Sequence, residues 1–252
     1  IRLKFDVYGI SDTGCVRELN EDSYCIRGFK DGEEPGFCVV ADGMGGHNAG
    51  EVASALAVEK ISGELSGILT SEGQGNRDLP RLINDSIDSA NYEIYEMSKE
   101  SAAQSGMGTT AVICVMAGAE SYIANVGDSR VYACRNDEIY QVTVDHSVVE
   151  ELVANGTITR EEARYHPQKN IITRALGTES KTRADIFEYE YFPGDVILMC
   201  SDGLSGMVED SRMKEIVRLG GSAEEIASSL CREAKNNGGS DNITVVCIRC
   251  LE

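Results

Sequence analysis

Apolar positions recur along the first hundred residues with two different periods. Residues 3–10 alternate apolar and polar positions, and residues 22–29 and 36–41 also have the pattern of strands. Apolar residues then recur every three or four positions from residue 48 or 49 to about 69, and again from about 80 to 100. This spacing is typical of amphipathic helices. The pattern therefore predicts three strands followed by a pair of helices.

The middle of the chain returns to the pattern of strands. The runs TAVICVM, SYIANV, RVYAC and EIYQVT, from Thr109 onward, are separated by short polar turns, which predicts an antiparallel meander. The loop GQGN at 73–76 is expected at the surface between the two helices. Residues 147–176 are polar and irregular apart from a short helix near 148–154, and this favours a functional lid or insert.

The last part of the chain repeats the order of strands followed by helices. A strand is expected at 187–192, with Phe187, Tyr189 and Tyr191 on one face, and the run VILMC is expected as a buried strand. Helices follow at about 210–219 and from the capping box of Ser222 and Glu225, before a final strand, NITVVCIRC. Grouped strands and paired helices favour an α+β fold of antiparallel sheets with helices packed outside.

Composition narrows the class of protein. The chain has 252 residues, of which 42% are hydrophobic, and its net charge is −19. This charge argues against a nucleic-acid partner, because phosphate backbones are held by clustered Lys and Arg. No apolar run is long enough to span a membrane, and the alternating start is unlike a signal peptide. The nine cysteines are scattered, mostly in apolar runs, which predicts reduced thiols and a cytoplasmic protein.

Cys247 and Cys250 form a C-x-x-C pair, but both fall on the expected last strand. Positions three apart on a strand point to opposite faces, so this pair is not expected to hold one metal ion.

Acidic residues recur where expected strands end. Asp42 follows the buried run FCVV and is followed by glycines at 43, 45, 46 and 50. Asp202 follows VILMC, Asp128 follows SYIANV, and Asp241 precedes the last strand. Each alone is compatible with a turn or a helix cap. Several carboxylates around one sheet system repel each other unless cations lie between them, and all-oxygen ligands select Mg²⁺ or Mn²⁺.

These stretches, in this order, resemble the metal-dependent serine/threonine protein phosphatases of the PPM (PP2C-like) family, in its bacterial single-domain form. The motifs cover essentially the whole chain, and together they are specific: SDTGCVRELNEDSY, VVADGMGGHNAGEVAS, GMGTTAV, ANVGDSRVY, TVDHS, ITRALG, LMCSDGLSGMV and SDNITVV. The resemblance implies a single domain over residues 1–252, folded as a four-layer α/β/β/α sandwich of two antiparallel sheets flanked by helix pairs. It also implies a flap at about residues 147–170.

The resemblance also implies a role for individual residues. Asp42 would bridge two core Mn²⁺ or Mg²⁺ ions, and the Gly43 carbonyl would bind one of them. Asp202 and Asp241 would complete the other ion's ligands, and Asp128, with Asp202, would hold a third, weaker ion. Further residues are expected beside these ions: Glu21 as a ligand, Asp22 and Asn242 as supports outside the ligand shell, and Arg17 as the contact to the substrate phosphate.

The expected reaction is hydrolysis of phosphoserine and phosphothreonine in proteins. Two ions about 3.5–4 Å apart activate a shared water for attack on phosphorus, and Arg17 holds two phosphate oxygens in a planar fork. Animal members have a histidine after the Asp-Gly pair that is thought to protonate the leaving group. Here that position is Met44, so the general acid is open, with a metal-bound water as the first candidate. His47, His146 and His166 are expected to be structural or flap residues, although His166 is also a candidate substrate contact.

Two other classes of function compete with this hypothesis. A catalytically weak relative that binds phosphoproteins and regulates a partner would have lost carboxylates, and the set here is intact. A nucleotide-binding module would need a Walker lysine or a Rossmann fingerprint, and the glycine loop after Asp42 has neither. The expected partners are phosphorylated proteins and a cognate serine/threonine kinase, and the chain is expected to be a monomer. The substrate and the preferred metal are not specified by the sequence.

Overall fold

The computed structural model describes residues 3–45, 49–69, 78–100, 104–118 and 120–251. Its strands are β1 Lys4–Asp12, β2 Asp22–Gly28, β3 Gly36–Met44, β4 Gly108–Thr109, β5 Ala111–Ala117, β6 Glu120–Val126, β7 Arg130–Arg135, β8 Glu138–Gln141, β9 Asp185–Glu188, β10 Val196–Cys200 and β11 Ile243–Leu251. Its α-helices are α1 Ala49–Leu65, α2 Leu79–Glu100, α3 Val148–Ala154, α4 Arg160–Tyr165, α5 Asp202–Ser205, α6 Asp210–Arg218 and α7 Ala223–Asn236. Two 3₁₀ turns are η1 Lys30–Gly32 and η2 Ser66–Leu69.

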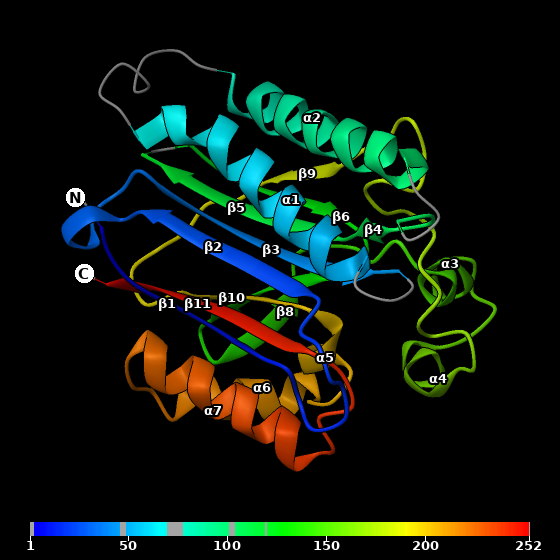
Figure 1. Cartoon of the computed structure of the whole chain (residues 1–252). Helices are drawn as coiled ribbons and strands as arrows, with labels where there is room; N and C mark the ends of the chain where they lie inside the picture. The colour runs from blue at the N-terminus through cyan, green and yellow to red at the C-terminus, as the bar shows by residue number, and fades with distance from the viewer. Residues whose placement is uncertain (1–2, 46–48, 70–77, 101–103, 119, 252) are drawn as a thin grey trace.

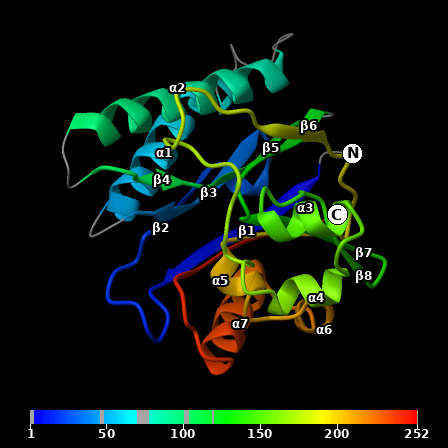
Figure 2. The same cartoon turned by 90° about the vertical axis from the view of Figure 1, so that its right-hand side faces the viewer.

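Two antiparallel sheets lie face to face, and a pair of helices covers the outer face of each (Figure 1). One sheet has the strand order β1-β11-β10-β7-β8, and the other has the order β2-β3-β5-β6-β9 with β4 paired to β3. Helices α1 and α2 cover the second sheet, while α6 and α7 cover the first. Helices α3 and α4 lie together at the end of the sandwich away from the two termini (Figure 1), the end that faces the viewer in Figure 2. This arrangement confirms the expected layers.

Strand β3 shows how side-chain alternation divides the core into layers. Phe37 and Val39 pack into the cluster under α1 and α2, while Cys38 and Val40 pack into the cluster between the sheets. Because successive side chains of a strand point to opposite faces, Asp42 follows Val40 on the side between the sheets. The apolar run that builds this core therefore ends by directing a carboxylate into the seam between the two sheets.

The predicted meander is wrong at its centre. Strands β5 and β6 pair in one sheet, and β7 and β8 pair in the other, so β6 and β7 are not neighbours. The turn at residues 127–129 crosses from one sheet to the other. Short polar turns fix the length of a connection but not the partner of the next strand, and this is why the sequence pattern did not reveal the crossing.

Other boundaries differ by a few residues. The helix expected to reach about residue 69 ends at Leu65 and continues as η2, and the strand expected at 187–192 ends at Glu188. Tyr189 and Tyr191 nevertheless pack with Phe187 between the sheets, as their alternation predicted. The 148–154 helix is confirmed as α3, whereas α4 and α5 were not predicted. The expected loop at 73–76 and a helix start at residue 48 lie outside the described residues.

All nine cysteines are free, and only Cys15 is exposed. Cys247 packs under α6 and α7, whereas Cys250 packs between the sheets, so the C-x-x-C pair does face in two directions. Across the described part of the chain, no helix is both long and apolar enough to cross a membrane.

Gly203 lets α5 approach β11 closely enough to bring two acidic segments together. A Cβ atom at Gly203 would overlap the backbone carbonyl oxygen of Asn242. This backbone has little freedom to move, because it leads directly into the fully buried start of β11. Gly203 is therefore a packing requirement of the fold.

We predict that Gly203→Ala destabilises the protein by about 1–3 kcal/mol, the usual cost of overpacking. Gly63→Ala is the matched control, because no atom lies within 4 Å of a Cβ at this exposed position of α1. The control should be neutral or stabilising by about 0.5–1 kcal/mol, since alanine is the better helix former. Urea unfolding of both variants and the wild type tests this. If Gly203→Ala were as stable as the wild type, the packing argument would be contradicted.

Candidate metal centre

A cavity of about 280 Å³ opens at the seam between the sheets, beside the segment that carries α3 and α4. Five separate parts of the chain line it with acidic or basic side chains, and the flap segment (residues 147–170) and its continuation add Asn170 and Ile172. The lining includes all the residues expected to contact metal or phosphate: Arg17, Glu21, Asp42, Gly43, Asp128, Asp202 and Asp241. Asp22 and Asn242 are buried and are not part of the lining.

The end of β3 is fixed by main-chain and hydroxyl contacts. The backbone N–H of Asp42 donates to Thr110 Oγ1 at 2.9 Å, and the N–H of Thr110 donates to the Asp42 carbonyl at 2.9 Å. The Gly43 N–H donates to the Glu21 carbonyl at 3.0 Å, and a Cβ at Gly43 would overlap the carbonyl of Gly50. Asp42 and Gly43 therefore have little room to move away from the cavity.

Asp22 lies directly opposite Asp42 in the pairing of β2 with β3. Ser201 Oγ donates to Asp22 Oδ2 at 2.7 Å, and the same hydroxyl accepts the Thr244 N–H at 3.0 Å. The second oxygen, Asp22 Oδ1, is buried and has no hydrogen-bond partner. Asp22 thus ties β2 of one sheet to β10 and β11 of the other, immediately behind the cavity.

Two acids come from the ends of central strands of the other sheet. Asp202 begins α5 directly after β10, and Asp241 lies just before β11. Both acids line the same cavity, and the charge of Asp202 is among the causes that raise the pKa of Asp42. The two carboxyl groups therefore face a place that a cation can take.

The electrostatics of the cluster follow from burial and like charge. Burial, reinforced by the charge of Asp22, raises the pKa of Asp42 well above its usual range. Burial and the nearby Asp202 raise the pKa of Asp128 to about 8, and burial raises the pKa of Asp22 to about 6. Burial also raises the pKa of Asp202. Without cations, the folded protein therefore keeps protons on carboxyl groups that would otherwise be ionised at neutral pH.

This donor set fits a hard divalent cation. The acids around the cavity offer only oxygen, the ligand that Mg²⁺ and Mn²⁺ prefer, and the unpartnered Asp22 Oδ1 can accept a hydrogen bond from a water beside such an ion. Among the described residues, no three Asp, Glu, His or Cys side chains already form a closed cage. Mutual repulsion accounts for this spacing, because carboxylates approach each other closely only around a proton or a cation.

Arg17 reaches the cavity from an exposed loop. Its Nη2 donates to Asp241 Oδ2 at 2.9 Å, its Nη1 lies 3.9 Å from Glu21 Oε2, and its side chain is 47% exposed. The loop itself is fixed by the side chain of Asn242, which donates to the Thr13 and Leu19 carbonyls and accepts the Glu21 N–H at 2.8 Å. Asn242 therefore sets where the Arg17 backbone lies relative to Asp241.

None of the described histidines lines the cavity. His146 is buried and contacts Gly127 and Asp185, and His166 ends α4 and accepts the Gln168 N–H. His47 lies outside the described residues. Met44 does line the cavity. The expectation that His146 is structural agrees with this geometry, whereas a substrate contact by His166 has no support from the cavity lining.

Comparison with known proteins now identifies the family. The model of the family described as protein phosphatase 2C matches residues 8–152, more than half of the chain. The chain belongs to the protein phosphatase 2C family. Among curated phosphatases it is 40% identical to "Serine/threonine phosphatase stp" of Listeria innocua over 241 residues, which is 94% of this chain and 93% of that protein.

Solved phosphatase structures share the whole fold. The serine/threonine phosphatase of S. agalactiae is 33% identical, with a TM-score of 0.89 over 98% of this chain and 100% of that chain. The catalytic domain of the phosphatase PstP, solved with two manganese ions, is 33% identical with a TM-score of 0.83 over 99% of this chain and 100% of that chain. The α+β sandwich expected from the sequence is thus the fold of these phosphatases.

Several residues of this phosphatase centre were missed from the sequence. Thr110, which holds Asp42, and Asn170 and Ile172, which line the cavity, were assigned no part. Helix α4 carries a signal that could have been found, since Thr159 and Glu162 form a capping box like that of α7. Thr110 had no such signal, because its contact with Asp42 joins residues 68 positions apart.

The raised pKa of Asp128 predicts how stability depends on pH without metal. Its pKa is about 8 in the folded protein and about 3.9 in an unfolded chain, so between these values only the folded state keeps the proton. Stability therefore falls as pH rises from about 4 to about 8. In excess EDTA we expect the free energy of unfolding of Asp128→Asn to rise relative to that of the wild type by about 1–3 kcal/mol as the pH increases from 5 to 8.

Thermal and urea unfolding at pH 5, 6.5 and 8 in excess EDTA would measure this difference. Asp88→Asn is the control, because Asp88 is exposed on α2 far along the chain from the cluster. If Asp128→Asn were stabilised by the same amount at all three pH values, or if Asp88→Asn were stabilised equally, a raised pKa at Asp128 would be contradicted.

Proposed function

We propose that this chain hydrolyses phosphoserine and phosphothreonine in proteins, using two core Mn²⁺ or Mg²⁺ ions and a weaker third. One observation carries the proposal: a single cavity gathers Arg17 and the carboxyl groups of Asp42, Asp128, Asp202 and Asp241 from five distant parts of the chain. Membership of the protein phosphatase 2C family, with relatives named serine/threonine phosphatases, supports the same reaction.

The assignment of ligands follows the place of each donor in the cavity. Asp42 is proposed as the acid that would hold both core ions, because the charges of Asp202, Asp128 and Asp241 all raise its pKa, which places it among the other acids. The Gly43 carbonyl, with Glu21 nearby, is proposed for one core ion, and Asp202 and Asp241 for the other. Asp128 and Asp202 are proposed for the third ion, and Asp22 and Asn242 support the ligands from behind.

When bound, the ions supply an activated water and a positive field around the phosphate oxygens. The protein's own part is to bind and orient the phosphate. Arg17 presents a planar fork that fits two phosphate oxygens. Its side chain is half exposed, so it can exchange its contact with Asp241 for the substrate while Asn242 keeps its backbone in place.

The leaving serine or threonine oxygen must receive a proton. Met44, which lines the cavity, has none to give, and the described histidines lie away from the lining. The pKa of Asp128 is about 8, so this carboxyl group keeps a proton at neutral pH without metal, but as a ligand it would be ionised. The proton is therefore proposed to come from water in the cavity, which Asp128 would help to orient.

The biological setting is part of the proposal. Residues 1–252 are proposed to act as one monomeric phosphatase domain in the cytoplasm, in signal transduction, where it opposes a serine/threonine kinase. The coverage of relatives and solved phosphatases over nearly their whole length supports the single domain.

Phosphate release from phosphopeptides tests the proposed function. We expect hydrolysis of phosphoserine and phosphothreonine peptides with Mn²⁺ or Mg²⁺, and much less hydrolysis of phosphotyrosine peptides. Asp42→Ala should lower kcat by more than about a hundredfold, beyond the cost of losing a partner outside the ligand shell. Activity that persists in excess chelator would exclude the metal mechanism, and unchanged turnover in Asp42→Ala would exclude the bridging role.

Arg17 should act mainly on substrate binding. Arg17→Ala should raise KM for a phosphopeptide about 10–100-fold, because a charged hydrogen-bond pair is lost in the ground and transition states alike. Arg17→Lys is the matched variant: it keeps the charge but not the fork, so its KM should lie between those of the wild type and Arg17→Ala. If KM and kcat both stayed at wild-type values in Arg17→Ala, Arg17 would have no place in the site.

A further inference from the structure

The turn that carries Asp128 is the crossing between the two sheets. Residues 127–129 join β6 of one sheet to β7 of the other. Asp128 lines both the 280 Å³ cavity and a neighbouring hollow of about 480 Å³ between the flap segment and the α5–α6 region. Gly127 has a φ of +109° and packs against Thr110, which leaves no room for a Cβ atom. Ser129 is hydrogen-bonded through its hydroxyl to Thr110 Oγ1 at 2.7 Å.

His146 forms hydrogen bonds with both main-chain groups of Gly127, at the start of this turn. The His146 N–H donates to the Gly127 carbonyl at 2.9 Å. In return, the Gly127 N–H donates to His146 Nδ1 at 3.0 Å. A ring nitrogen that accepts a hydrogen bond carries no proton, so this contact requires a neutral ring protonated at Nε2.

Two groups lie beside Nε2, and the Asp185 carboxylate is the one that suits this tautomer. Asp185 Oδ2 lies 3.2 Å from Nε2 and can accept its proton. Arg174 Nη1 lies 2.8 Å from the same nitrogen and can only donate to it, but its N–H groups are shared with the Arg183 carbonyl at 2.9 Å and Asp185 Oδ1 at 3.0 Å. The positive charge of Arg174 disfavours a second proton on the ring. Arg174 and Asp185 thus compete for Nε2, and Asp185 is the partner that leaves Nδ1 free to accept the Gly127 N–H.

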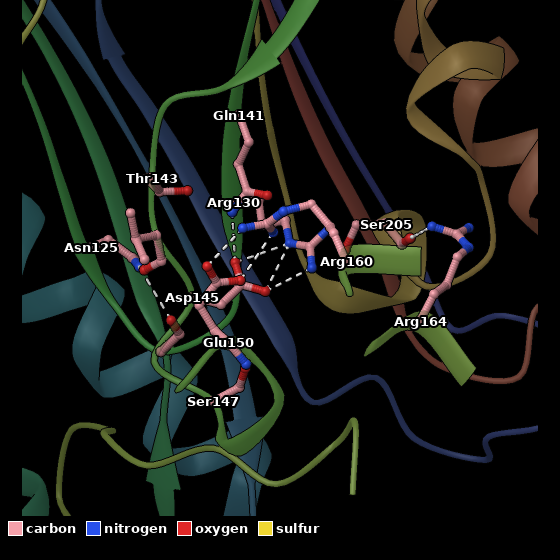
Figure 3. A network of polar contacts seen from close by, with 12 residues as sticks. Asn125, Arg130, Gln141, Thr143, Asp145, Ser147, Glu150, Arg160, Arg164 and Ser205 are labelled. Carbon is pink, nitrogen blue, oxygen red and sulfur yellow. Dashed lines mark hydrogen bonds and ion pairs between the residues drawn. The ribbon is translucent and has the colours of Figure 1, made fainter. Parts of the chain in front are cut away.

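Asp145 binds the side chain of Arg130, at the other end of the turn (Figure 3). Arg130 Nε donates to Asp145 Oδ1 at 3.0 Å and Arg130 Nη2 donates to Asp145 Oδ2 at 2.7 Å, which is a two-point fork. The Asp145 side chain is only 6% exposed, and Gln141 Nε2 donates to its Oδ1 at 2.7 Å. Asp145 is therefore itself held in place.

Side chains from elsewhere in the chain thus hold Gly127, Ser129 and Arg130, and the residue left to face the cavity is Asp128. The turn needs such restraint, because the Asp128 and Asp202 carboxyl groups line the same cavity and repel each other whenever both are ionised, which favours a turn that swings outward. We propose that Asp145 and His146 are positioning residues that hold the 127–130 turn so that Asp128 faces Asp202. The inference rests on the proposed role of Asp128 at the third ion.

Two substitutions of His146 separate the hydrogen bond from the bulk of the ring. In His146→Asn, the side-chain oxygen can take the place of Nδ1 and accept the Gly127 N–H. In His146→Gln, the amide reaches the place of Nε2 and can still contact Asp185, but the acceptor for Gly127 is lost. His146→Asn should therefore keep the hydrogen bond from the Gly127 N–H and His146→Gln should lose it, although the two new side chains are similar in size and polarity.

The first measurement is amide hydrogen exchange at Gly127 in excess EDTA, which needs neither metal nor turnover. We expect exchange about tenfold faster in His146→Gln, the effect of losing one buried hydrogen bond, and near the wild-type rate in His146→Asn. The second measurement is calorimetric titration with Mn²⁺. His146→Gln should bind the weakest ion about tenfold less tightly, as for loss of an outer-shell partner, with the tight ions unchanged.

The outcomes that overturn the proposal are specific. Equal exchange in the Asn and Gln variants, whether fast or slow, would show that the acceptor at Nδ1 does not hold the turn. Faster exchange with an unchanged third ion would show that the hold on the turn does not position Asp128. Asp128→Ala tests the proposed function separately: if it loses no ion, the ligand role of Asp128 fails, and the exchange pair still decides whether His146 holds the turn.

A second variant covers the possibility that His146→Gln does not fold. Arg130→Lys keeps the charge opposite Asp145 but removes the fork, so the 128–130 amides should exchange faster and the third ion should bind about tenfold less tightly. Wild-type exchange and metal binding in Arg130→Lys would overturn the part assigned to Asp145.

Discussion

The constraint on which this structure depends is the mutual repulsion of carboxyl groups that the fold forces into one seam. Asp22, Asp42, Asp128 and Asp202 reach the seam because apolar strands of two sheets end there. The free energy that packs those strands is therefore what holds the acids together. Burying an unpaired carboxylate costs several kcal/mol, so the folded protein must keep protons on this cluster or accept cations. Affinity for cations is, in this sense, a consequence of how the two sheets meet.

Repulsion of this kind is useful only if the backbone cannot relieve it by moving. The contacts that fix the backbone beside Asp22, Asp42 and Asp202 are of two kinds: glycines that let main chains touch, as at Gly43 and Gly203, and neutral hydroxyl or amide groups that fasten one segment to another. Ser201 joins Asp22 to β11, and Asn242 fastens the Arg17 loop to the start of β11. These contacts carry no charge, so they restrain the acids without neutralising them.

The sequence predicts those parts of the fold that depend on local pattern. The period of α2 and the capping box of α7 each depend on residues only a few positions apart, and both helices were predicted correctly. The acids after buried runs were likewise found from local pattern, and the structure gathers them in one cavity. What the sequence could not provide is pairing over long separations. Arg17 has Glu18 and Glu21 as acidic neighbours in the sequence, yet its shortest contact is with Asp241, 224 residues away. Likewise, nothing local in Gly127–Ser129 shows that the next strand joins the other sheet.

The most exposed and the most buried parts of the site differ in how far their side chains can move. The acids sit on backbone fixed from several sides, and their side chains are short, so their geometry changes little. Arg17 has a fixed backbone but a long, half-exposed side chain whose partner, Asp241, belongs to the proposed ligand set. A cation bound at Asp241, as proposed, would weaken that ion pair by competing for the carboxylate. Metal binding and release of the arginine toward a phosphate would then be coupled through one carboxyl group.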